Sequence, residues 1–146
     1  MQTKFFNILL AFTVVLLMAS CKKDEKKIDT SLLPGIWQIT GTEQYLHFHD
    51  DGTGAFWDES EDVYEDDIEV DGNGWFNWAV AEETSNSKTV VKVALNFKIA
   101  VSGGSVPKNA TITQLDASSM TWQDAFKNQT YFTRKKEPET QQSQTP

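Results

Sequence analysis

The feature of this sequence that most constrains its fold is a hydrophobic period of two. In residues 89–101 every second side chain is apolar, and these positions are Val91, Val93, Leu95, Phe97, Ile99 and Val101. Successive side chains of a β-strand point to opposite faces of the sheet. The pattern therefore predicts a long strand, or two strands in series, with one apolar face.

The same alternation recurs along the chain, in Leu46 and Phe48 and again in Phe76, Trp78 and Val80. Shorter strand candidates are residues 36–40, 55–57, 63–70, 110–115, 120–124 and 130–134. Clusters of Asp, Gly, Asn and Ser, which favour turns, separate them. Because strands joined in chain order by hairpin turns close into an up-and-down barrel or pack as two sheets, we expect an all-β fold of one of these kinds.

The N-terminus has the layout of a cleaved export signal. Lys4 precedes an apolar stretch at residues 8–18, followed by Ala19, Ser20 and Cys21, the only cysteine. The stretch is shorter than the roughly 20 apolar residues that a transmembrane helix requires. We therefore expect residues 1–20 to be a signal peptide and Cys21 to be a lipidation site.

Met18-Ala19-Ser20-Cys21 resembles the lipobox of bacterial lipoproteins, in which the signal is cut before the cysteine and the new N-terminus is acylated. Lys23, Asp24 and Glu25 resemble the lysine-plus-acidic signal of Bacteroidetes lipoproteins that are exported to the outer face of the outer membrane. The resemblance implies an outer-membrane, lipid-anchored protein exposed at the cell surface. The alternative is a charged tether on a protein that faces the periplasm.

Composition divides the mature chain into three parts. Residues 21–31 are charged and poor in apolar side chains, which is typical of a flexible tether, and residues 135–146 have the composition of a disordered tail. Residues 32–134 remain as a single domain. The formal net charge of −8 and the absence of a basic stripe argue against nucleic-acid binding, so membrane attachment is expected through acyl chains alone.

The start of this domain, Leu33-Pro34-Gly35-Ile36-Trp37, resembles the Gly-x-Trp motif of the first lipocalin strand. In that family the tryptophan plugs the closed end of the barrel and an arginine of the last strand packs over it. The resemblance assigns barrel-closing roles to Gly35, Trp37 and Arg134, where a guanidinium on an indole is worth about 0.5–2 kcal/mol. It favours a small lipocalin-like, up-and-down antiparallel β-barrel of about eight strands, with a two-sheet β-sandwich as the alternative.

The lipocalin resemblance also implies a function. An inward row of side chains would line a site for a small apolar or amphipathic ligand, and its candidate members are Val91, Val93, Leu95, Phe97, Ile112, Met120 and Trp122. The alternative is a filled barrel that acts through its outer surface as a non-catalytic accessory or interaction protein of the cell envelope. Ligand identity, protein partners and oligomeric state are not encoded in any motif.

His47 and His49 are the only histidines, and strand alternation places them on one face. Two imidazoles at this spacing can bind one zinc ion, with Asp50 or Asp51 near enough to add an oxygen. The simpler interpretation places both side chains on the solvated face, opposite Leu46 and Phe48. No cofactor and no metal site is therefore expected, and His47 and His49 are the candidates if one exists.

The acidic segment, residues 58–71, holds nine carboxylates and no Lys or Arg. Asp67, Glu69, Asp71 and Gly72 imitate the start of an EF-hand loop, but Trp78 stands where the bidentate glutamate belongs. A solvated, self-repelling sheet edge explains the segment, with calcium binding of another kind as the alternative.

Trp75 is the candidate surface contact, because Phe76 and Trp78 occupy the alternating apolar phase and leave its indole outside the barrel. An exposed indole beside acidic residues suits a sugar ring or an apolar ligand. No serine-nucleophile elbow, phosphate loop or dinucleotide motif occurs, so we expect no enzymatic activity.

Overall fold

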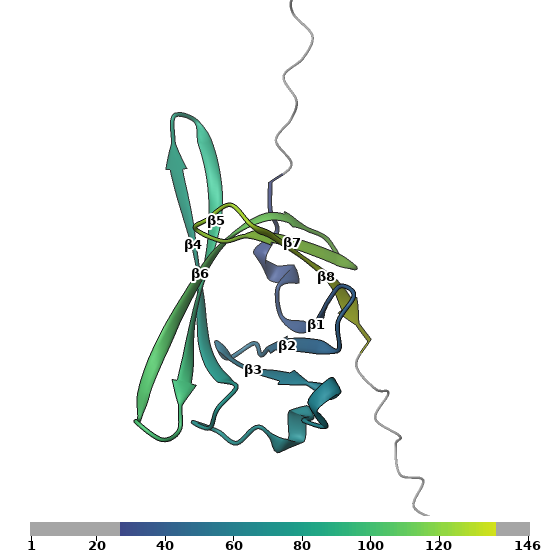
Figure 1. The fold of residues 1–146 in the computed structure, drawn as a ribbon. Coiled ribbons are helices and arrows are strands. Elements are labelled where there is room, and N and C mark those ends of the chain that lie inside the picture. Colours follow the sequence, from purple (N-terminus) through teal and green to yellow (C-terminus); the bar gives the residue numbers. More distant parts are fainter. Residues whose placement is uncertain (1–26, 137–146) are drawn as a thin grey trace, which may run out of the picture.

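The computed structural model describes residues 27–136, which form a closed antiparallel barrel with the strand order β1-β2-β3-β4-β5-β6-β7-β8 (Figure 1). The strands are β1 (Gly35–Ile39), β2 (Gln44–Phe48), β3 (Thr53–Asp58), β4 (Trp75–Ser85), β5 (Lys88–Ile99), β6 (Gly104–Leu115), β7 (Ser119–Gln123) and β8 (Gln129–Lys135). The expected all-β, up-and-down barrel is confirmed, and the two-sheet sandwich is not formed.

Residues 89–99 lie in one strand, β5, and not in two in series, while Ala100 and Val101 belong to the turn that follows it. Its hairpin with β4 turns at Asn86 and Ser87, which both adopt positive φ angles of 49° and 63°. Such a two-residue turn matches the right-handed twist of the flanking strands. The register places Val80 opposite Val93 and Phe76 opposite Phe97, so the apolar rows of the two strands share the inner face.

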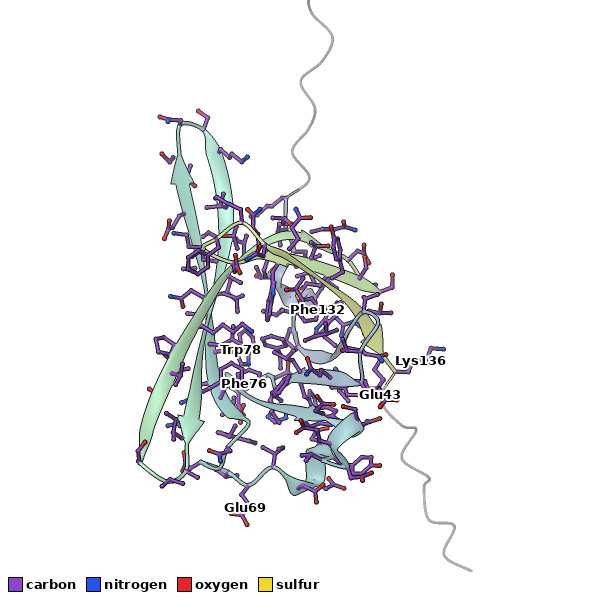
Figure 2. All side chains as sticks on the ribbon, viewed as in Figure 1. Glu43, Glu69, Phe76, Trp78, Phe132 and Lys136 are labelled. Atoms are coloured by element: carbon purple, nitrogen blue, oxygen red, sulfur yellow. The ribbon has the colours of Figure 1, made fainter. Side chains whose placement is uncertain are left out.

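The inner faces of the strands build a continuous core. Its fully buried side chains include Phe48, Phe76 and Phe132, and Figure 2 shows Phe76 and Phe132 among the strands, with Glu69 at the periphery. Gly54 permits a close approach of neighbouring strands, because a Cβ atom there would collide with the His47 carbonyl oxygen and the Phe76 ring. The barrel interior is therefore tightly packed where β2, β3 and β4 meet.

A second apolar cluster lies on the outer face of the first three strands. This outer cluster consists of Ile36, Tyr45, Ala55 and Trp57, all at most 6% exposed. The β3–β4 connection, residues 59–74, covers it with the 3₁₀ helices η2 (Glu59–Glu61) and η3 (Glu65–Asp67). The side chains of Val63 and Ile68, together with Trp75 of β4, pack against it.

Two expectations for the acidic segment were therefore wrong. Residues 63–70 contain a 3₁₀ helix and turns in place of a strand, and the segment is not simply a solvated edge. Val63 and Ile68 are the only large aliphatic side chains in its first eleven residues, and both are partly buried. Burying them holds the segment against the sheet, while its carboxylates remain at the surface.

The chain before β1 closes one end of the barrel. The 3₁₀ helix η1 (Thr30–Leu32) leads into Leu33, which is fully buried in the core, and Ile28 also packs against the core. Thr30 and Ser31 of η1 thus lie within the part of the chain that the sequence predicts to be a flexible tether. At the other end, β8 extends to Lys135, one residue beyond the expected domain boundary.

Candidate functional site

Strand β2 and the residue that follows it present two imidazoles, His47 and His49, on the outer surface of the barrel. The side chain of His47 is 19% exposed and that of His49 is 27% exposed, while Leu46 and Phe48 point into the core. The two rings meet edge to face with their centroids 4.3 Å apart. The predicted alternation of β2 is confirmed, and both histidines are half-buried instead of fully solvated.

The β3–β4 connection brings Glu65 of η3 to these histidines. One oxygen of its carboxylate, Oε1, contacts His47 Nδ1 and lies 3.5 Å from His49 Nε2. The backbone N–H of Tyr64 donates to the Asp67 carboxylate at 2.9 Å, which stabilises the start of η3. Because Val63 and Ile68 pack on either side of η3, Glu65 is held over β2 by apolar contacts as well.

Burial by itself would raise the pKa of Glu65. The hydrogen bonds and positive charge available from His47 and His49 outweigh that effect, so the pKa of this carboxyl lies below its usual value. Glu65 is consequently an anion, and one ring nitrogen of each histidine faces its carboxylate.

A hydrogen-bond chain fixes the orientation of His49. The Thr53 hydroxyl donates to the Asp51 carboxylate at 2.5 Å, so its oxygen is left to accept from His49 Nδ1 at 2.9 Å. With its proton on Nδ1, the neutral ring directs the lone pair of Nε2 towards Glu65. Two acceptor atoms that face each other are stabilised by a group between them that donates hydrogen bonds or carries positive charge, such as a water molecule, a proton or a metal ion.

The sequence did not identify Glu65. Asp50 and Asp51 were expected to supply the oxygen, yet the described residue that joins the histidines is Glu65, and Asp51 acts one step further out through Thr53. The signal that could have found it is the pair of aliphatic residues, Val63 and Ile68, around Glu65 in an otherwise acidic segment. They mark a stretch that must pack on another part of the protein.

Trp75 is not the freely exposed indole that was expected. It lies on the outer face of β4 opposite Ala55, and it packs against the outer cluster with partial exposure. Its ring centroid is 5.5 Å from that of His49. Trp75 therefore forms an apolar wall beside the two histidines.

The candidate ligand-lining residues do lie together, inside the barrel. All except Phe97, which is partly buried, are at most 3% exposed, and these six are Val91, Val93, Leu95, Ile112, Met120 and Trp122. They contact the rest of the core, as in the edge-to-face pair of Trp122 and Phe132, with ring centroids 4.5 Å apart. A side chain with no accessible surface is surrounded by protein atoms. No space large enough for a water molecule lies next to it.

The predicted barrel-closing residues are brought together. Trp37 and Arg134 are register partners on β1 and β8, and the guanidinium lies 4.2 Å from the centre of the indole ring. Arg134 also donates to the carbonyl oxygens of Pro34, at 2.8 Å, and of Leu32. Gly35 is required there, because at φ +121° a Cβ atom would collide with the guanidinium.

An open groove of about 500 Å³, which no sequence pattern predicted, lies on β4, β5, β6 and the turn after β7. Small side chains form much of its floor, namely Ala79, Ala81, Ala94 and Thr111. Lys92 and Glu83, which form an ion pair at 2.6 Å, lie at the groove together with Lys127. It is separate from the histidine site.

Cys21 and the residues Lys23, Asp24 and Glu25 lie outside the described residues. Within residues 27–136 no helix combines the length and hydrophobicity needed to span a bilayer. A scan against protein-family models, a search of the curated proteins and a search of the solved structures each found no match.

Proposed function

We propose that this chain is a lipid-anchored protein of the bacterial cell envelope whose barrel is a filled scaffold and whose outer surface makes its functional contacts. One observation carries the proposal: Val93 and Leu95, at the centre of the predicted lining, are 0% exposed. A carrier for a small apolar molecule needs a concave site that buries most of its ligand. The packing of the interior favours a non-catalytic accessory or interaction protein over such a carrier.

The closed end of the barrel supports the same function. Leu33, Trp37 and Arg134 block the end where β1 begins and β8 finishes, as the hydrogen bonds of Arg134 to this segment require. The features with accessible polar chemistry, namely the histidine site and the groove on β4–β6, both lie on the outside. Partners would thus be recognised by the outer wall.

The location of this function is inferred from the sequence. The lipobox-like Met18-Ala19-Ser20-Cys21 supports acylation of Cys21, and Lys23, Asp24 and Glu25 support surface exposure. A single acyl chain gives only marginal membrane binding, so stable anchoring requires more than one chain on the mature N-terminus.

An overpacking variant tests the filled interior. Val93→Trp should lower the free energy of unfolding by about 1–3 kcal/mol, because extra volume in a packed core forces neighbouring side chains and backbone to move. Native mass spectrometry of the protein isolated from its own host should give the mass of the mature acylated chain alone, with no bound small molecule, both with and without the substitution. Urea denaturation measures the loss of stability.

Val106→Trp provides the matched control, since Val106 is 51% exposed and the chemical change is identical. Its free energy of unfolding should stay within about 0.5 kcal/mol of the parent value. A small-molecule mass that copurifies with the parent chain and disappears in Val93→Trp would establish the carrier function and refute the filled scaffold.

Removal of the thiol tests the location. Cys21→Ser should abolish incorporation of labelled palmitate and release the protein from the membrane fraction, because no other segment is expected to anchor it. Replacement of Lys23, Asp24 and Glu25 by alanine should preserve the label while protecting the protein from protease added to intact cells. Cys21→Ser protein that remains labelled and membrane-bound would contradict the lipid anchor.

A further inference from the structure

We propose that His47, His49 and Glu65 form a binding site for a Zn²⁺ ion on the outer wall of the barrel. Each residue offers one ligand atom, and the three atoms lie within 4.8 Å of one another. They come from two separate parts of the chain, namely the end of β2 with the residue after it and the β3–β4 connection, which the outer cluster holds together. The site goes beyond the proposed function, since a filled barrel requires no metal.

The donor set identifies the metal. Two imidazole nitrogens and one carboxylate oxygen are ligands typical of zinc, with bond lengths of about 2.0–2.2 Å and a tetrahedral arrangement. Tetrahedral ligands at that distance are separated from one another by roughly 3.3–3.5 Å. The separation between His49 Nε2 and Glu65 Oε1, 3.5 Å, fits this value. Ca²⁺ and Mg²⁺ bind oxygen ligands in larger number, so they do not fit.

The surroundings of His49 support a ligand role. Metal-bound histidines almost always donate their second ring N–H to an acceptor, which fixes the tautomer and directs the other nitrogen at the metal. The contact from His49 Nδ1 to the Thr53 hydroxyl, with Asp51 behind it, is an interaction of this kind. It leaves Nε2 free to bind an ion, and Trp75 limits solvent access from the side.

His47 completes the set through Nδ1, which contacts Glu65 Oε1 directly. When a metal binds between these two atoms, it replaces the proton that they share, and they separate to the distance of metal ligands. The side chain of Glu65 is 32% exposed and η3 carries no buried residue, so this movement does not disturb a core. The fourth tetrahedral position faces solvent and would hold water.

The test uses the full chain with Cys21→Ser and without a histidine tag, so that no thiol or added imidazole competes for the metal. Titration with Zn²⁺ alone, monitored by isothermal titration calorimetry, should give a stoichiometry of one ion per chain. His49→Ala and Glu65→Gln should each weaken binding at least tenfold, and Thr53→Val should weaken it about 10–100-fold because it removes the acceptor for His49 Nδ1.

Glu69→Gln is the matched control for Glu65→Gln. It removes the same charge from the same segment at an exposed position outside the cluster, so the affinity should not change. Circular dichroism of each variant verifies the fold, and the absorption of the Co²⁺-loaded chain reports coordination number independently of affinity. Intense visible bands are expected for a four-coordinate site.

Three results would overturn the site: no stoichiometric binding of Zn²⁺, binding that Glu65→Gln and His49→Ala leave unchanged, or displacement of Zn²⁺ by an equal concentration of Ca²⁺. If His49→Ala fails to fold, Glu65→Gln and Thr53→Val decide the matter, since Glu65→Gln is nearly isosteric and Thr53→Val preserves the shape of a β-branched side chain.

Discussion

Replacing Trp37 with alanine should lower the free energy of unfolding by about 3–5 kcal/mol, as is usual when a buried aromatic side chain is truncated. Trp37 is 0% exposed, and its indole N–H donates to the Leu33 carbonyl oxygen at 2.8 Å. The substitution leaves a cavity, removes the partner of that carbonyl and takes away the ring beneath Arg134. Chemical denaturation with urea measures the loss.

Phe126→Ala is the control for this experiment. Phe126 is 86% exposed in the turn after β7, so its truncation should change the free energy of unfolding by less than about 0.5 kcal/mol. The domain as a whole is expected to have a stability of about 5–15 kcal/mol, and the Trp37 variant would lose a large part of it. A loss for Trp37→Ala no larger than that of Phe126→Ala would show that the indole does not close the barrel.

Trp57→Ala should lower the free energy of unfolding by about 3 kcal/mol and release the β3–β4 connection from the barrel wall. Trp57 is 4% exposed, and it stacks on Tyr45 with ring centroids 5.3 Å apart. Its indole N–H also donates to the Glu59 carboxylate at 3.3 Å, and Lys135 of β8 contacts the same oxygen at 3.1 Å. Both contacts attach η2 to the barrel.

Limited proteolysis with identification of the fragments by mass spectrometry follows the release. Cleavage within residues 59–74 should become faster in Trp57→Ala, because local opening then costs less free energy. Tyr131→Ala, on the 56% exposed Tyr131 of β8, should leave the cleavage pattern as in the parent chain. Unchanged cleavage in the Trp57 variant would mean that the outer cluster does not hold this connection.

The barrel was predictable because its signal is local. The period-two pattern of β5, the turn residues between strands and the first-strand motif with Gly35 and Trp37 each depend on a few neighbouring positions. Strand alternation also predicted which side chains point inward, and Val93 and Leu95 are buried accordingly. Strand alternation does not predict the volume left between the inward-pointing side chains, since this volume depends on how side chains from all eight strands fit together.

The histidine cluster was only half predictable. Periodicity alone places His47 and His49 on the same side of the chain, whereas Glu65 reaches them through a connection whose path is set by tertiary packing. Charge dominates the composition of the acidic segment, and this hid the two aliphatic side chains that direct it across the sheet. Local patterns place residues on a face of an element, but they do not state which distant segment covers that face.

The largest loop-closure entropy cost in this barrel falls on the pairing of its first and last strands. Every strand from β1 to β7 pairs with the next strand in sequence; six of these pairings are joined by short turns, and β3 and β4 are joined by residues 59–74. The remaining pairing, β1 with β8, joins the two ends of the domain at Trp37 and Arg134. Bringing distant residues together carries a greater loop-closure cost than forming a hairpin, and it slows folding. The stacking of Arg134 on Trp37 thus stabilises the strand pairing that has the largest loop-closure cost, and it joins the first and last strands into one cooperative unit.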